Sequence, residues 1–89
     1  MKINLAPLRD EVWLVTIDGP PKTEHRVRVT PADRQRLGYA PNETSQLLEA
    51  SFRFLLEREP NTSILRDFDL PVISRYFAEY ENEIRKRGS

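Results

Sequence analysis

Few residues in this sequence have types suited to catalysis or metal binding. His25 is the single histidine, and cysteine is absent. This composition excludes Cys–His dyads, multi-histidine metal sites and zinc-protease helices, because these need thiolates or several imidazoles. The three glycines, Gly19, Gly38 and Gly88, lie too far apart for a glycine-rich phosphate loop. We therefore expect no metal site and no cofactor.

Carboxylates are the remaining residues that could act in catalysis. Asp67 and Asp69 could approach a magnesium ion, and Glu79, Glu81 and Glu83 lie close together. Neither set has a distinctive spacing. Asp69 is better explained as a helix cap, and the glutamates as helix-pair partners, with Glu81 and Glu83 each four residues before an arginine. We expect a protein that is not an enzyme and has no catalytic residues.

The charge balance argues against a global attraction to polyanions. Fourteen Lys and Arg residues match 14 Asp and Glu residues, so the formal net charge is zero. No overall field then concentrates nucleic acid or anionic lipid. A cysteine-free chain without a secretory segment is typical of the cytoplasm, and no apolar run reaches the roughly 20 residues that span a bilayer. We expect a cytoplasmic protein without membrane contact.

A local basic patch nevertheless keeps nucleic acid open as an alternative partner. Arg26, Arg28, Arg34 and Arg36 outnumber the one acid among them, Asp33. No aromatic residue alternates with these arginines to stack on bases. The patch therefore indicates either a solvated arginine face or a phosphate-binding surface.

Residues 64–77 resemble a helix-turn-helix, with a short helix and a tight turn before a second helix that carries Ser74 and Arg75. The turn glycine is missing, because Asp69 stands in its place, and Asp67 and Asp69 would repel phosphates. The resemblance implies a small DNA-binding regulator that uses Arg75 together with the arginine patch. This is our alternative hypothesis for function.

Two strands begin the set of elements that position these residues. Glu11 to Ile17 is rich in β-branched and aromatic residues, and Glu24 to Thr30 alternates apolar and polar side chains. The intervening turn residues favour an antiparallel hairpin with a longer loop. Lys2 to Leu5 is a candidate third strand at the edge. His25 shares a strand face with two valines, which indicates a packed histidine rather than a catalytic base.

Helical signals fill the rest of the chain. Thr30 to Asp33 combines a capping residue, a proline at the first helical position and an acid three residues after the cap, and Gly38 is placed to end this helix. The later helices we expect are one capped by Asn42, Thr44 or Ser45 and running to about Arg58, a short segment through Ile64 and Leu65, and a last one from about Leu70 to Lys86.

The second expected helix has an unusually wide apolar surface. Its apolar residues cover roughly 240° of the circumference when 100° is allowed per residue. They are Leu47, Leu48, Ala50, Phe52, Phe54, Leu55 and Leu56. Such a helix needs cover on two sides. Either it lies between the hairpin and the last helix, or its spare face around Leu47, Ala50 and Phe54 docks on a second protomer or a different protein.

The leading hypothesis is a non-catalytic protein-interaction or self-association module. The fold we expect is α+β, with a β-hairpin or three-stranded antiparallel sheet packed against three to four helices. Residues 1–89 form one domain, with a hairpin region over 1–30 and a helical region over 31–87. The expected core consists of Trp13, Val15, Ile17, Val27, Val29, Leu48, Phe52, Leu55, Ile73, Phe77 and Ile84.

Three sequence segments between residues 47 and 84 resemble a group of small uncharacterised bacterial proteins. The segments read LLEASFRFLLEREP, SILRDFDLPVISRYF and EYENEI. The resemblance implies a bacterial, cytoplasmic origin. It implies no activity, ligand or partner.

Overall fold

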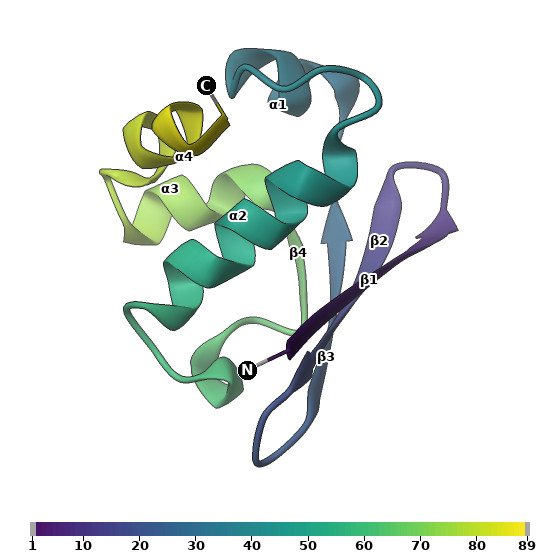
Figure 1. Cartoon of the computed structure of the whole chain (residues 1–89), viewed down its shortest axis with the longest axis vertical. Helices are drawn as coiled ribbons and strands as arrows, with labels where there is room; N and C mark the ends of the chain where they lie inside the picture. The colour runs from purple at the N-terminus through teal and green to yellow at the C-terminus, as the bar shows by residue number, and fades with distance from the viewer. Residues whose placement is uncertain (1, 89) are drawn as a thin grey trace.

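The structure is a computed structural model that describes residues 2–88. The elements in chain order are β1 (Lys2–Arg9), β2 (Val12–Asp18), β3 (Thr23–Arg28), α1 (Pro31–Arg36), α2 (Thr44–Leu56), the 3₁₀ helix η1 (Asn61–Ser63), β4 (Asp67–Asp69), the 3₁₀ helix η2 (Leu70–Val72), α3 (Ile73–Tyr76) and α4 (Tyr80–Gly88). Figure 1 shows α2 between the strands and α4.

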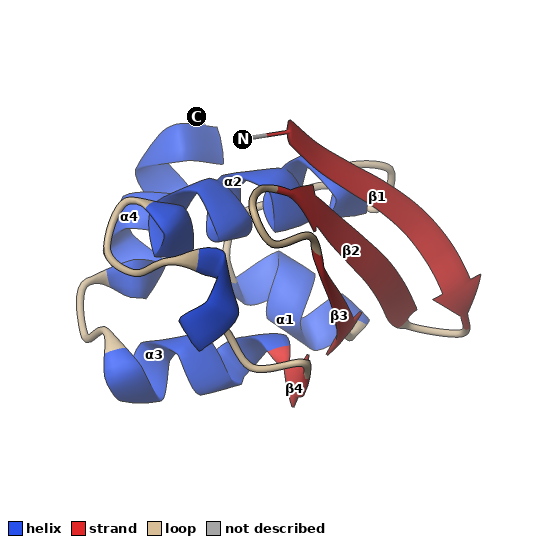
Figure 2. Cartoon of the chain, turned by 90° about the horizontal axis from the view of Figure 1, so that it is seen from below, coloured by secondary structure: helices blue, strands red, loops and turns tan. Residues whose placement is uncertain are grey.

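One mixed sheet carries the strands in the order β1-β2-β3-β4. The first three strands form an antiparallel meander, and β4 runs parallel to β3. The helices gather on one side of this sheet (Figure 2). The α+β class, the hairpin and its packing against helices are confirmed. The edge strand exists and is longer than expected, because it continues from Lys2 to Arg9.

The fourth strand was not predicted. It consists of Asp67, Phe68 and Asp69, and aspartate is among the residues depleted in strands. Its position follows from long-range contacts. The Arg26 amide donates to the carbonyl of Arg66 at 2.8 Å, and Phe68 stands beside a valine of β3 in the register.

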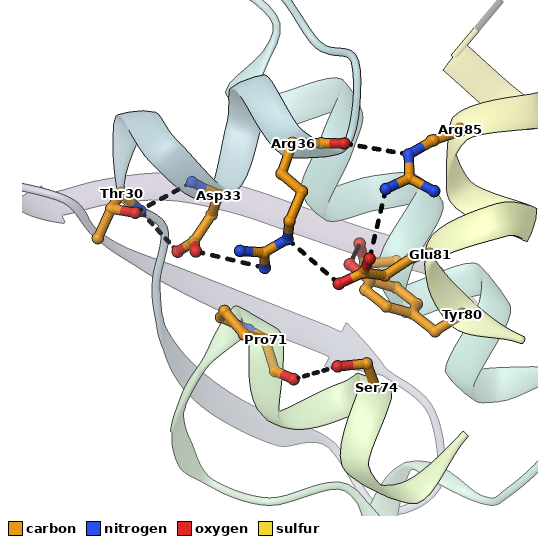
Figure 3. Close-up of polar contacts among 9 residues, drawn as sticks. Thr30, Asp33, Arg36, Pro71, Ser74, Tyr80, Glu81 and Arg85 are labelled. Carbon is orange, nitrogen blue, oxygen red and sulfur yellow. Dashed lines mark hydrogen bonds and ion pairs between the residues drawn. The ribbon is translucent and has the colours of Figure 1, made fainter. Parts of the chain in front are cut away.

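Helix α1 begins and ends as its residues predict. The Asp33 amide donates to the Thr30 hydroxyl at 3.1 Å, and the Thr30 amide donates to the Asp33 carboxylate at 3.0 Å (Figure 3). This reciprocal pair satisfies two amides that a helix start leaves free. Gly38 follows the helix with φ at 82°, a conformation that glycine adopts without strain. Helix α2 differs, because its capping position is Glu43 and no side chain caps it.

The last helix is broken, which corrects the prediction of one helix over Leu70–Lys86. η2 and the four-residue α3 come first, and Phe77 is extended, with φ at −133° and ψ at 99°. Helix α4 then starts at Tyr80. The break turns the Phe77 ring onto α2 and leaves Tyr76 exposed. The short helical segment also ends earlier than expected, because Ile64 is extended.

The core confirms the expected list, with Trp13 and Phe77 packed against it as partly buried members. Helix α2 contacts both β1 and α4. It therefore lies between the sheet and the C-terminal helix, which is the first of the two alternatives for its wide apolar surface. The ion pairs expected on α4 also form. Glu81 pairs with Arg85 at 3.4 Å and Glu83 with Arg87 at 3.8 Å.

Candidate interaction groove

The expected docking face of α2 is mostly enclosed within the chain. Leu47 and Phe54 have no exposed surface. The Phe54 ring contacts the edge of Phe77 at a centroid distance of 5.8 Å and that of Tyr80 at 5.3 Å. The Arg58 guanidinium covers the Phe54 ring at 3.6 Å from its centroid. The prediction that Leu47 and Phe54 lie on a spare outer face is therefore wrong, because both are buried and α4 and Arg58 fill the space beside Phe54.

Ala50, the third residue of that predicted face, remains half-buried. It lines a hollow of about 320 Å³ with Leu5, Arg53 and Arg87. Each of these arginines already pairs with a nearby glutamate, at 3.3 and 2.8 Å. The arginines of this hollow are therefore already paired, and it offers no unpaired cation of its own.

An apolar groove lies on another side of α2. Its volume is about 310 Å³, and its walls come from the C-terminal end of α2, residues 63–65, Phe68 of β4, and the segment formed by η2, α3 and Phe77. Aliphatic and aromatic side chains make most of this lining. The broken C-terminal helix and the unpredicted strand thus create the groove, since both supply walls to it.

Exposed apolar side chains concentrate at this groove. Among the described residues, the large hydrophobic side chains with high exposure are Leu8 at 45%, Leu65 at 45% and Tyr76 at 68%. Leu65 and Tyr76 both line the groove. A small protein gains stability by burying such groups, so their clustering beside a concave apolar surface makes the groove a candidate binding site.

Glu59 is the one charged residue of the described lining. Its side chain is half-buried and forms no hydrogen bond or ion pair with any residue from 2 to 88. Burial raises the pKa of the Glu59 carboxyl above its ordinary value. The groove therefore carries a partly desolvated carboxylate without a cation.

A buried polar network holds one wall of the groove. The Nδ1 atom of His25 contacts the carbonyl of Leu65 at 2.7 Å, and its Nε2 atom contacts the Thr23 hydroxyl at 3.0 Å. The Asn61 amide donates to the same hydroxyl at 3.0 Å and to the carbonyl of Pro21 at 2.7 Å. These contacts fit a neutral imidazole with its proton on Nδ1.

The network gives His25 a structural role. Burial lowers the pKa of His25, which opposes its protonation. The prediction of a packed histidine is confirmed, since His25 is fully buried and its ring lies 5.4 Å from that of Phe52. Neither the histidine nor the described carboxylates form a metal site, because no group of three or more potential ligands gathers among residues 2–88.

The helix-turn-helix over residues 64–77 is absent from the described structure. β4 occupies the place of the turn, and α3, with four residues, is too short to be a recognition helix. The Ser74 hydroxyl donates back to the carbonyl of Pro71 at 2.7 Å (Figure 3). The sequence resemblance failed because the segment pairs with β3 instead of forming two helices.

Two of the four arginines of the predicted patch, Arg28 and Arg36, form ion pairs with acids. Arg26 and Arg28 stand beside Asp67 and Asp69 in the register of β3 and β4. Arg28 lies 3.6 Å from Asp69 and 3.7 Å from Glu11. Strand β4, which was not predicted, thus brings carboxylates alongside Arg26 and Arg28 of β3 and offsets the positive charge of these arginines.

The remaining patch arginines differ in their surroundings. Arg36 pairs with Glu81 at 3.2 Å, and the Arg85 guanidinium donates to the carbonyl of Arg36 at 3.0 Å (Figure 3). Arg34 is half-buried, and its Nε atom has no hydrogen-bond acceptor among the described residues. Arg75 is exposed on α3. DNA binding by these arginines stays a prediction.

Comparison with known proteins gives no further guide to function. No family model, curated protein or solved structure matches the chain. Among the helices of residues 2–88, none has the length and apolar character required to cross a bilayer. Sequence reasoning missed Leu65, Tyr76 and Glu59 as site residues. Glu59 had no distinguishing local signal, because it ends the charged run Glu57-Arg58-Glu59.

Proposed function

We propose that the chain is a non-catalytic protein-interaction module that docks another polypeptide in the groove and acts in the cytoplasm. The observation that carries this proposal is the position of Leu65 and Tyr76. Two of the three most exposed large apolar side chains in the described chain line one apolar concavity. A polypeptide that covers them would remove apolar surface from water, which is the main driving force of association.

The size of the groove sets the scale of the contact. A volume of about 310 Å³ lies at the lower end of the roughly 300 to 1,000 Å³ that ligand pockets span. It has room for an anchor of one or two side chains. Burying the exposed parts of Leu65 and Tyr76 contributes on the order of 1 to 2 kcal/mol each. This supports a modest, reversible association.

A peptide-display selection tests the proposal. We expect short peptides selected on the folded protein to carry apolar anchors and to lose binding to a Leu65→Ser, Tyr76→Ser variant. The matched control is Leu8→Ser, because Leu8 has the same 45% exposure as Leu65 but does not line the groove. Fluorescence anisotropy measures both affinities. Peptides that bind both variants equally well would rule the groove out as the docking site.

A further inference from the structure

We infer that the occupant of the groove is a second copy of this chain, bound in a two-fold symmetric dimer in which Glu59 of each copy pairs with Arg66 or Arg75 of the other. This inference rests on the proposed function. It names the partner of the same groove, so the two ideas share Leu65 and Tyr76 but depend on different charged residues.

The first argument is that the groove surface carries both halves of a contact. Leu65 and Tyr76 project as exposed anchors, and the apolar lining beside them can receive such anchors. In a two-fold interface the same patch faces itself, so each copy supplies anchors and receives them. A partner of different sequence would need the groove surface to supply only the anchors or only the apolar lining that receives them.

The second argument is charge complementarity. Arg66 follows Leu65 directly and Arg75 precedes Tyr76 directly, and both arginines are exposed. Neither forms an ion pair with another described residue, in contrast to Arg28, Arg36, Arg53, Arg58, Arg85 and Arg87. Unpaired cations thus directly adjoin both anchors along the chain, and an unpaired carboxylate, that of Glu59, lies in the groove lining.

The third argument is that the chain does not satisfy Glu59 by itself. Its neighbour Glu57 pairs with Arg87 at 2.8 Å and Arg58 at 3.3 Å, and Glu79 pairs with Arg58 at 3.1 Å. The arginines nearest in sequence are therefore occupied. An arginine from a second copy would supply the missing cation, and a guanidinium matches a carboxylate in geometry as well as in charge.

The contact patch is small, so the dimer is expected to be weak. Interfaces below about 1,200 Å² of total buried surface are typical of transient complexes. We expect monomer at low micromolar concentration, dimer near millimolar concentration, and weaker association at high salt because exposed charges are screened.

Charge reversal in two variants provides the test. In one variant Glu59→Lys places a cation against the partner's arginines. In the other, Arg66→Glu and Arg75→Glu place carboxylates against the partner's Glu59. Each variant alone is expected to dimerise at least about tenfold more weakly than the native chain, because both symmetric contacts become repulsive. In an equimolar mixture both contacts are attractive again, so a heterodimer is expected.

Sedimentation velocity across the concentration range measures these equilibria, and circular dichroism checks that each variant folds. Arg9→Glu, which reverses an exposed arginine of β1 at the opposite edge of the sheet, is the matched control and should leave dimerisation unchanged. A native chain that stays monomeric near millimolar concentration overturns the inference. So does a mixture that associates no better than its parts. In either case, groove-specific peptides from the display selection would still support the proposed function.

Discussion

Replacing Phe54 by alanine separates a core residue from a docking residue. The Phe54 side chain is fully buried, and its ring contacts Phe77, Tyr80 and the Arg58 guanidinium. If these contacts hold the fold together, Phe54→Ala must reduce the stability of the isolated chain. Truncating a docking residue would have a different effect, because it would weaken association and leave the stability of the isolated chain unchanged.

The expected loss follows from the burial of the ring. Truncating a buried phenylalanine to alanine costs about 3 to 5 kcal/mol of unfolding free energy, and the lost cation–π contact with Arg58 adds about 0.5 to 1 kcal/mol. Domains have about 5 to 15 kcal/mol of stability in total, and a chain of 89 residues belongs at the lower end. Since about 1 kcal/mol shifts the midpoint of a domain this small by roughly 4 to 8 °C, we expect Tm to fall by at least about 12 °C.

Urea unfolding followed by circular dichroism measures this change, with Tyr76→Ala as the matched control. Tyr76 is 68% exposed, so its truncation should change the unfolding free energy by no more than about 0.5 kcal/mol. The reasoning is refuted if Phe54→Ala costs less than about 1 kcal/mol, or if the two variants lose similar amounts.

Four further predictions concern the rest of the chain. Burial lowers the pKa of His25 below its unfolded value of 6.5, so the unfolded chain binds the proton more readily; stability is complete above about pH 6.5 and falls toward pH 5.5, as urea midpoints at several pH values would show. An NMR titration of the His25 ring with a midpoint at or above 6.5 would contradict this. Thr30→Ala should cost about 1 kcal/mol through loss of the cap of α1, against no change for an exposed threonine such as Thr62→Ala. Gly38→Ala should cost about 1 kcal/mol because φ is 82°, although nothing lies within 4 Å of an added Cβ; equal thermal midpoints for the two proteins would exclude backbone strain there. If the alternative DNA hypothesis holds, duplex binding must weaken steeply between about 50 and 200 mM salt, and an absence of binding at low salt would end it.

Features with local sequence signals could be predicted. Alternation of apolar residues placed the hairpin of β2 and β3, and the Thr30 to Asp33 capping pattern placed the start of α1. The spacing of apolar residues also identified most of the core, including Val15, Phe52 and Ile84. These features depend on residues within a few positions of one another, which is the range that periodicity describes.

Features that depend on contacts between distant parts of the chain could not be predicted from the sequence. β4 forms because Asp67–Asp69 lie beside β3, about 40 residues earlier in the chain, and the composition of that segment opposes a strand. The enclosure of Phe54 depends on its contact with Arg58 and on the helix break at Phe77. Helical periodicity predicts neither feature. The groove depends on both features, so its position could not be read from the sequence.

The parallel pairing of β4 with β3 has a consequence for synthesis on the ribosome. The meander of β1, β2 and β3 is translated first, and its outer strand then lacks a neighbour until Asp67–Asp69 have emerged. During that interval the nascent chain presents unpaired amides and carbonyls that other chains can bind, which is the origin of edge-to-edge aggregation. Every second residue of β3 is charged, and these residues, Glu24, Arg26 and Arg28, point away from the core. Their charges oppose aggregation at the exposed edge of β3 until β4 pairs with it.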